Sequence, residues 1–311
     1  MTPPETPAYA TEIVPFDAAG IASAAALVLD RQPVAVPTET VYGLAADATS
    51  ADAVARIYAA KGRPSFNPLI VHVPDLAAAE RLGVFDADAR ALAEAHWPGP
   101  LTIVVPARAD NKIAALVTAG LGTIALRVPA HPAMQALLAA CARPLAAPSA
   151  NASGRISPTR AAHVLASLDG RIALVIDGGP TARGIESTIV AATGGGLRLL
   201  RRGPIQVDAP LASGTIEAPG MMASHYAPSK PLRLDATEAR DSEFLIGFGN
   251  VAGDFSLSDS GDLIEAAARL FDLLHLADAA PQPRIAVAPI PEQGIGAAIR
   301  DRLQRAAAPR P

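Results

Sequence analysis

The stretch KGRPSFNPLIVHV, from Lys61 to Val73, contains the end of a predicted helix, a turn with two prolines and a predicted buried strand. Residues 51–63 place apolar side chains at helical spacing, and a helix rarely continues past a proline. Residues 68–73 form a short apolar run that only His72 interrupts, which is typical of a buried strand. A helix that leads directly into a buried strand indicates an α/β domain.

The same alternation of Ala-rich helices and short apolar strands continues as far as Ile205. Further helices are predicted at residues 21–32, 86–97, 131–142 and 157–168. Further strands are predicted at residues 33–38, 101–105, 123–128, 144–150, 172–177, 187–192 and 197–203. Strand 101–105 is followed by strand 123–128, and strand 187–192 by strand 197–203, without a predicted helix between them. Directly joined strands favour antiparallel pairing, so a mixed sheet is predicted rather than an all-parallel one.

The composition changes at residues 210–231, which are rich in Pro, Gly, Ser and Ala and are typical of a linker. Beyond the linker, strands are predicted at 231–236, 243–249 and 284–290, and helices at 262–278 and 296–307. We therefore predict three parts: a twisted mixed-sheet α/β domain at residues 1–209, a linker or lid at 210–231, and a small Rossmann-like α/β domain at 232–311.

The composition of the 311 residues narrows the class of protein. Half of them are apolar, which provides ample material for a core, and the net charge of −4 argues against stable direct binding of nucleic acid. The apolar runs are shorter than the roughly 18 residues of a membrane span, and the N-terminal stretch lacks the pattern of a signal peptide. The single cysteine, Cys141, excludes an internal disulfide and favours a reducing compartment. A soluble cytoplasmic protein without membrane contact is expected.

The quoted stretch also collects polar side chains around its strand. Lys61 and Arg63 close a helix, where the helix dipole favours cations in any case. The alternative is that both face a polyphosphate, Lys61 as a point charge and Arg63 as a planar fork. Asn67 lies between the two prolines and could hydrogen-bond the same ligand. His72 shares a strand face with Ile70, although a lone histidine in a strand is more often a structural core residue.

Two further stretches place polar side chains at strand ends. The stretch PTETVYGLAADA, residues 37–48, is either a ligand-binding turn or a strand-to-helix turn in which Thr38 or Thr40 caps a helix. The stretch LRVPAHP places Arg127 at the end of a strand. An arginine there suits a ligand carboxylate or phosphate, or else a structural ion pair. Arg201 similarly ends a strand in LLRRGPI.

The stretch APSANASGRISPT, residues 147–159, combines small residues with a row of hydrogen-bond donors that includes Ser149, Asn151 and Ser157. Small residues let a backbone approach a ligand closely. A helix is predicted to begin at Ser157 and the proline after it, and the free N–H groups of a helix N-terminus attract anions. The stretch GIESTIV brings Ser187 to the start of another strand.

Other kinds of site are disfavoured by the sequence. The six histidines are scattered and Cys141 lies in an apolar helix, so no cluster has metal-ligand spacing. Neither a GxxxxGK[ST] loop nor a GxSxG elbow is present. What recurs is cations and hydroxyls at strand ends, where ligands of open α/β sheets bind. This pattern favours a reaction that depends on positioning and charge neutralisation, as phosphoryl and nucleotidyl transfers do.

Together these stretches resemble the YrdC-like family, the threonylcarbamoyl-AMP synthases. The resemblance rests on PTETVYGL, KGRPSFNPLIVHV, WPGPLTIVV, LRVPAHP, APSANASGRISPT, DGG, GIESTIV and LLRRGPI, which occur in the family's order. They cover nearly all of the first domain. The stretch APGMMASHYAP, followed by a small α/β domain, is similar to the long, two-domain form of the family.

The resemblance implies a reaction and its participants. L-threonine, bicarbonate or CO2, and ATP with Mg2+ would give threonylcarbamoyl-AMP and pyrophosphate. The product would pass to a tRNA threonylcarbamoyltransferase that modifies adenosine 37 of tRNA. No dedicated metal ligand in the chain is implied, because Mg2+ would bridge phosphate oxygens with mostly water ligands.

The resemblance also implies a role for individual residues. Lys61 and Arg63 would be the catalytic cations that neutralise charge as pyrophosphate leaves. The residues implied to hold L-threonine are Thr40, His72, Arg127, Ala147 and Ser187. Those implied to hold ATP are Lys61, Arg63, Asn67, Thr123, Ser149, Asn151, Ser157, Arg201 and Tyr226, the last from the linker.

Three alternatives remain beside the synthase. One is a fold of this type that binds RNA or nucleotide without catalysis, which the acidic net charge and the complete set of polar motifs disfavour. Another is the carbamoyl transfer of hydrogenase-maturation proteins, which are much larger and carry acylphosphatase and Cys-rich zinc segments that this sequence lacks. The third is a purely structural interaction protein, which would not need so many cations and hydroxyls at strand ends.

Overall fold

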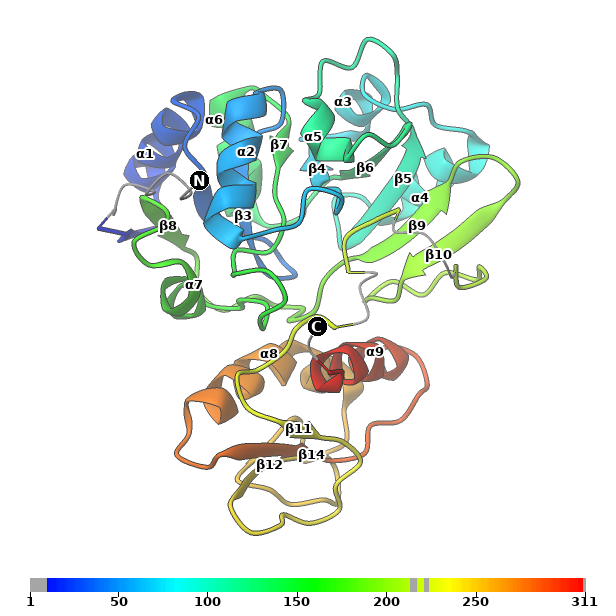
Figure 1. The fold of residues 1–311 in the computed structure, drawn as a ribbon. Helices are drawn as coiled ribbons and strands as arrows, with labels where there is room; N and C mark the ends of the chain where they lie inside the picture. The colour runs from blue at the N-terminus through cyan, green and yellow to red at the C-terminus, as the bar shows by residue number, and fades with distance from the viewer. Residues whose placement is uncertain (1–9, 213–216, 221–223, 310–311) are drawn as a thin grey trace.

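The computed structural model describes residues 10–212, 217–220 and 224–309, which form two α/β domains, one above the other in Figure 1. The larger, N-terminal domain is built on a ten-stranded sheet in the order β1-β8-β2-β3-β7-β4-β6-β5-β9-β10. Its strands are β1 (Glu12–Pro15), β2 (Val34–Pro37), β3 (Tyr42–Asp47), β4 (Ile70–His72), β5 (Leu101–Pro106), β6 (Thr123–Arg127), β7 (Leu145–Ala146), β8 (Leu174–Asp177), β9 (Thr188–Ala192) and β10 (Leu197–Arg201).

The prediction of a mixed sheet is confirmed. Strands β5 and β6 pair antiparallel, as do β9 and β10, whereas β4 pairs parallel with β6 and β5 pairs parallel with β9. Helices cover the sheet (Figure 1). They are α1 (Ala18–Leu29), α2 (Ala51–Lys61), α3 (Leu76–Glu80), α4 (Ala87–His96), α5 (Ala115–Thr118), α6 (Pro132–Cys141) and α7 (Ala161–Leu168).

Helix α2 shows how the sequence fixes the ends of an element near the site. The hydroxyl of Ser50 accepts a hydrogen bond from the backbone N–H of Ala53 and so caps the first turn. Gly62 follows the last helical residue in the left-handed conformation, with a φ of 59°, which glycine adopts at little cost. The helix therefore stops at Lys61 and turns the chain toward β4.

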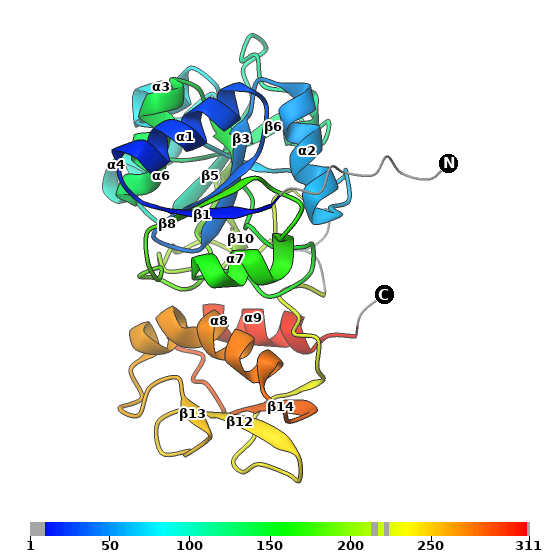
Figure 2. The ribbon, with the colours of Figure 1, turned by 90° about the vertical axis from the view of Figure 1, so that its left-hand side faces the viewer.

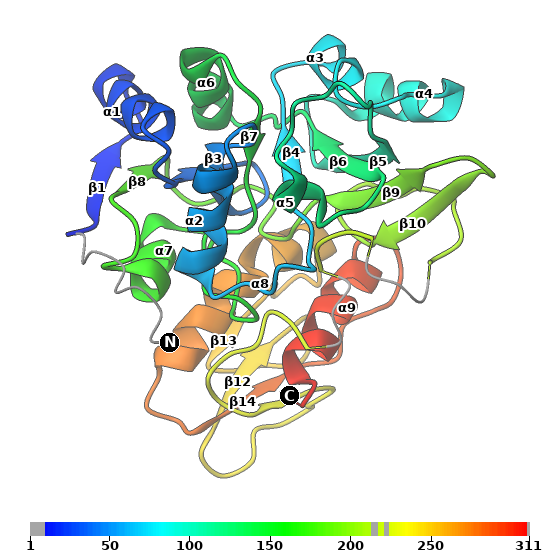
Figure 3. The same ribbon diagram turned by 45° about the horizontal axis from the view of Figure 1, so that its top comes forward.

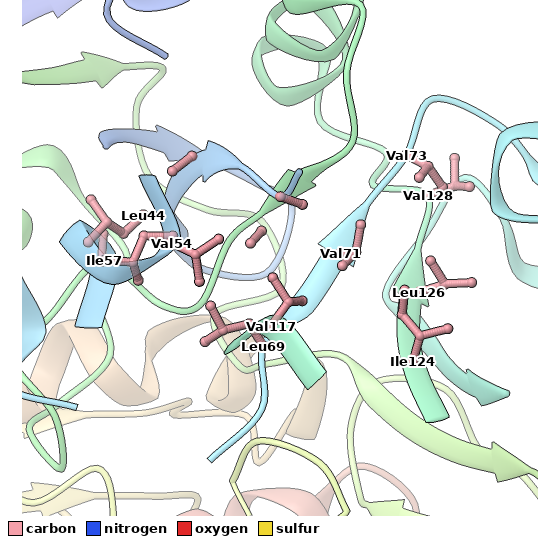
Figure 4. Close-up of a cluster of buried hydrophobic side chains, with 14 of the residues drawn as sticks. Leu44, Val54, Ile57, Leu69, Val71, Val73, Val117, Ile124, Leu126 and Val128 are labelled. Atoms are coloured by element: carbon pink, nitrogen blue, oxygen red, sulfur yellow. The ribbon is translucent and has the colours of Figure 1, made fainter. Parts of the chain in front are cut away.

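The core between α2 and the sheet is aliphatic (Figure 4). Val54 and Ile57 of α2 are fully buried and belong to one cluster with Leu44 of β3 and Val71 of β4. Val117 of the short helix α5 joins the same cluster. Dense packing of this kind holds backbone positions at the strand ends, which is what a site built from strand ends requires.

Two local expectations are wrong. Residues 37–48 do not form a strand-to-helix turn, because Thr38 and Thr40 lie in the tight turn between the antiparallel strands β2 and β3. The hydroxyl of Thr38 accepts hydrogen bonds from the backbone of that turn instead of capping a helix. Helix α7 begins at Ala161 rather than at Ser157, whose hydroxyl donates to Glu186.

The C-terminal domain contains a parallel four-stranded sheet in the order β11-β14-β12-β13, as predicted for a small α/β unit. Its elements are β11 (Leu232–Arg233), β12 (Glu243–Gly247), β13 (Phe255–Ser256), α8 (Leu263–Ala279), β14 (Arg284–Val287) and α9 (Gly296–Ala307). Figure 2 shows that α8 and α9 form a layer between this sheet and the N-terminal domain.

The two domains share a hydrophobic interface. Val41, Ile156 and Ile185 of the first domain belong to the same buried cluster as Phe271 on α8. Figure 3 shows α8 and α9 side by side beneath the first domain. Gly184 allows the close approach, because a Cβ there would come within 2.4 Å of the backbone oxygen of Ala267 on α8. The second domain is therefore packed directly against the segments that lead into β9. In the part of the chain that the structure describes, no helix has the length and apolar character to span a membrane.

Candidate active site

One cavity gathers most of the side chains that the sequence analysis singled out. It lies over the face of the sheet formed by β4 and β6, between the β2–β3 turn, the segment after β7, the start of β9, the end of β10 and the described part of the linker. The predicted residues that line it are Thr40, Arg63, His72, Arg127, Ala147, Ser149, Ser187, Arg201 and Tyr226.

Arg127 and His72 lie side by side because β4 and β6 are parallel and in register at this pair. The guanidinium of Arg127 is buried and donates through Nη2 to Glu39 Oε1 at 2.6 Å and through Nε to the Gly99 carbonyl at 3.3 Å. Glu39 also accepts from the backbone N–H of Ala130 at 3.1 Å. The Arg127 side chain is therefore held in a fixed orientation at the cavity wall.

Glu39 remains ionised at this position. Burial raises the pKa of its carboxyl, but the charge and hydrogen bond of Arg127 and the hydrogen bond from Ala130 outweigh burial and leave the pKa below its ordinary value. The structural ion pair, one of the two alternatives that the sequence left for Arg127, is present, and the same side chain lines the cavity.

His72 is almost fully buried, and within the described chain its Nδ1 has no hydrogen-bond partner. Burial, reinforced by the positive charge of Arg127, lowers the pKa of the imidazole to about 3. The ring is therefore neutral near pH 7. A neutral imidazole at a cavity wall has one nitrogen that can donate a hydrogen bond to a bound molecule and one that can accept a hydrogen bond from it.

The depressed pKa of His72 predicts a pH-dependent stability. Below about pH 6.5 the unfolded chain protonates this histidine, whereas the folded chain does not until about pH 3, so stability falls as the pH drops between these values. From pH 7 to pH 5 we expect His72 to contribute a loss of about 2 kcal/mol. Urea unfolding of the wild type and of His72→Gln at both pH values measures this contribution to the free energy of unfolding. An equal loss in both proteins contradicts the assignment.

Ser187 and Arg201 meet in another part of the cavity lining. Arg201 is buried and donates through Nη2 to the Ser187 hydroxyl and through Nε to the Ser187 carbonyl, both at 3.0 Å. The Ser187 hydroxyl is also 2.8 Å from that of Thr102. Burial lowers the pKa of Arg201 and the nearby Tyr226 ring raises it, with a net lowering. A buried cation of this kind favours a bound anion.

The ammonium of Lys61 does not project into the cavity as a polyphosphate-facing cation. Its side chain is buried, and Nζ donates to the carbonyl oxygens of Ser149 and Asn151. Lys61 therefore holds the Ser149–Asn151 segment against the end of α2. The physical reason is that a buried ammonium takes the nearest acceptors that can satisfy its three protons.

Arg63 lines the cavity beside this segment. It donates through Nε to the Asn67 carbonyl at 3.1 Å and through Nη2 to the Pro68 carbonyl at 2.9 Å. Burial lowers the pKa of Arg63 to about 10, and burial with repulsion from Arg63 holds the pKa of Lys61 well below its ordinary value. Two neighbouring cations in a dry region are stabilised by an anion that binds between them.

Besides Lys61, four predicted residues are not part of the cavity lining: Asn67, Thr123, Asn151 and Ser157. Thr123 begins β6 and, because side chains alternate along a strand, shares the face that carries Arg127. Asn151 is fixed by two bonds from its amide to the carbonyls of Ala152 and Arg155. The hydroxyl of Ser157 donates to Glu186, and the buried Asn67 anchors Arg63 through its carbonyl.

Tyr226 closes the cavity from the side of the second domain. Its ring is buried, packs against Phe271 of α8 with 5.5 Å between ring centroids, and meets the imidazole of His225 edge-on at 4.1 Å. Burial raises the pKa of the Tyr226 phenol. The described part of the linker therefore reaches the same space as the residues of the first domain.

Comparison with known proteins agrees with this geometry. Residues 27–203 match the Sua5, YciO and YrdC family model, described as Telomere recombination, and residues 181–308 match the model described as Threonylcarbamoyl-AMP synthase, C-terminal domain. A threonylcarbamoyl-AMP synthase of Bacillus subtilis is 41% identical over 92% of this chain and 92% of its own. The Pyrococcus abyssi enzyme is 37% identical over 91% of this chain and 92% of its own. The crystal structure of P. abyssi Sua5 complexed with L-threonine has a TM-score of 0.87 at 34% identity, covering 96% of this chain and 97% of that one. The chain belongs to the threonylcarbamoyl-AMP synthase family.

The sequence analysis of this threonylcarbamoyl-AMP synthase family member missed three residues of the site. Glu186 and His225 line the cavity, and Glu39 holds the cavity-lining Arg127. Glu39 and Glu186 occur within PTETVYGL and GIESTIV, but only their hydroxyl neighbours were considered there. His225 lies in the linker beside Tyr226, and burial, with repulsion from Arg63 and Lys61, lowers its pKa well below the ordinary value. The sequence did offer a signal for Glu39 and Glu186, because each is the one charged residue in its stretch, PTETVYGL or GIESTIV.

The acidic groups in and beside the cavity do not form a metal cage. Glu39 is paired with Arg127 and Glu186 with Arg302, a residue of α9. Among residues 10–212, 217–220 and 224–309, no group of three or more His, Cys, Asp or Glu could hold a metal ion. The site of this synthase family member is thus dominated by positive charge.

Proposed function

We propose that this chain makes threonylcarbamoyl-AMP from L-threonine, bicarbonate and ATP, with release of pyrophosphate. Membership of the synthase family supports the product, and the P. abyssi structure was determined with L-threonine. The observation that carries the proposal is a single cavity whose one wall suits an amino acid and whose other wall suits phosphates. Each half by itself would fit many proteins, whereas their combination fits a reaction that joins the two ligands.

The amino-acid wall is centred on Arg127. Its Nε and Nη2 are already engaged, and we assign the threonine carboxylate to the remaining face of the guanidinium. His72, neutral and lining the cavity, would hydrogen-bond the amine or the hydroxyl. Thr40, Ser187 and the backbone at Ala147 line the same space and would complete the recognition of threonine.

The phosphate wall consists of Arg63, Arg201 and the Ser149–Asn151 segment that Lys61 holds in place. Arg63 and Arg201 would neutralise the triphosphate directly. The other residues assigned to the nucleotide are Asn67, Thr123, Ser149, Asn151, Ser157 and Tyr226. Tyr226 lines the cavity and carries a buried phenol, which suits a nucleoside.

The chemistry follows from this arrangement. The threonine amine captures bicarbonate, with loss of water, to give a carbamate. A carbamate oxygen attacks the α-phosphorus of ATP, a new P–O bond forms, and the bond between the α-phosphorus and the bridging oxygen breaks as pyrophosphate leaves. Arg63, with Lys61 behind it, stabilises the negative charge that develops on the leaving group. His72 and Arg127 keep the carbamate oriented.

Magnesium would enter with ATP as part of the substrate complex. We propose that phosphate oxygens and water hold it, because Glu39 and Glu186 are already paired with arginines. The product would pass to a tRNA threonylcarbamoyltransferase, as the family resemblance implies. We place the reaction in the cytoplasm, since the lone Cys141 is buried and suits a reducing compartment.

The direct test is pyrophosphate release from Mg-ATP by the full-length chain. We expect release that requires both threonine and bicarbonate, because only the carbamate provides the attacking oxygen. Each is omitted in turn, and serine replaces threonine as a matched control. Release that continues without threonine contradicts the proposed acceptor. Binding of Mg-ATP without any release favours the alternative of a binding module.

A further inference from the structure

The second domain contributes a buried charge to the wall of the cavity. Arg302 lies on α9, and its side chain is fully buried although it is an arginine. Its Nε donates to Glu186 Oε2 at 3.0 Å. Glu186 belongs to the first domain and lines the cavity. An ion pair across the domain interface therefore reaches the site itself.

Glu186 is placed where its charge affects the rest of the site. Its Oε1 accepts from the hydroxyl of Ser157, and it directly precedes Ser187, to which Arg201 is bonded. A buried carboxylate beside a triphosphate site repels the ligand unless a cation neutralises it. Arg302 is that cation, and it comes from the other domain.

Arg302 also contacts the linker. Its guanidinium carbon lies 5.5 Å from the centre of the Tyr226 ring, within the range of a cation–π interaction. Tyr226 lines the cavity as well. One side chain of α9 thus touches two separate parts of the cavity wall.

We propose that Arg302 is a positioning residue, through which docking of the second domain completes the nucleotide site. It neutralises Glu186 and thereby leaves Arg63 and Arg201 available for phosphates. This inference rests on the proposed function, since it assigns the phosphates of ATP to that wall.

The test compares Arg302→Met with Arg300→Met in the full-length chain. Arg300 lies on the same helix, and its recorded partners Asp235, Ile290 and Glu292 all belong to the second domain. By calorimetry with Mg-ATP alone, we expect Arg302→Met to weaken binding about tenfold or more. Arg300→Met should change it less than about twofold.

A double-mutant cycle with Glu186→Gln separates positioning from mere support of the fold. The amide keeps an acceptor for Ser157 but removes the charge that needs compensation. In the Glu186→Gln background we therefore expect Arg302→Met to weaken Mg-ATP binding less than about threefold. The remainder reflects the contacts of Arg302 with Tyr226 and Asp301. An equal loss in both backgrounds, or no loss in either, overturns the proposal.

Two measures keep the test decisive. Thermal unfolding establishes whether each variant is folded. If Arg302→Met is not folded, Arg302→Lys replaces it in the cycle. We expect Arg302→Lys to weaken Mg-ATP binding about threefold, and we expect no such weakening in the Glu186→Gln background. The cycle uses nucleotide binding, so it decides the role of Arg302 even if the wild type fails to release pyrophosphate. That failure would count against the proposed function alone.

Discussion

Replacement of Lys61 by Ala should lower the turnover number about a hundredfold or more, while the Kd for threonine should change less than about threefold. Two effects combine to lower the turnover number. The variant removes one of two buried cations beside the phosphate wall, and it releases the carbonyls of Ser149 and Asn151 that Nζ holds. Arg127 and His72 do not depend on Lys61 for their position, so recognition of threonine should persist.

The measurement is steady-state pyrophosphate release together with calorimetric titration of threonine. Lys112→Ala is the matched control, because Lys112 is exposed and lies outside the cavity lining. Lys61→Met tests whether volume rather than charge matters, since Met fills the same space without an ammonium. If turnover and threonine affinity fall by the same factor, Lys61 supports the whole site and has no special role at the phosphates.

Much of the architecture could be predicted from periodicity and local turn chemistry. Helix α9 was predicted at residues 296–307 and is observed at Gly296–Ala307, because its charged and apolar residues alternate at helical spacing. Strand β3 was not predicted. All of Tyr42–Asp47 is buried, so the strand has no polar alternation to reveal it, and both interpretations of residues 37–48 were turns.

The site could be predicted only where a recognisable motif carried it. Arg127 pairs with Glu39, which is 88 positions away in the chain, and Arg302 pairs with Glu186 across 116 positions. Such pairs depend on how the sheet and the two domains assemble, and no local pattern encodes them. The same reason explains why the contacts of Lys61 were not predicted, since its acceptors belong to a segment far from it in the sequence.

Replacement of Arg127 by Leu should abolish measurable threonine binding, with a Kd raised about a hundredfold or more, because the carboxylate loses its planar cation. Mg-ATP binding should change less than about threefold, since Arg63 and Arg201 remain. The variant also leaves Glu39 buried without its partner, which we expect to cost about 3–5 kcal/mol of folding free energy. Urea unfolding and calorimetry on the same preparations measure the two effects.

The double variant Arg127→Leu with Glu39→Gln distinguishes recognition from stability. Removing the carboxylate charge eliminates the unpaired buried ion, so most of the lost stability should return, while threonine binding should stay absent. Recovery of threonine binding together with stability would mean that Arg127 acts only as the partner of Glu39. The expected separation follows from the geometry: Glu39 engages Nη2 and the Gly99 carbonyl engages Nε, while the same side chain lines the cavity.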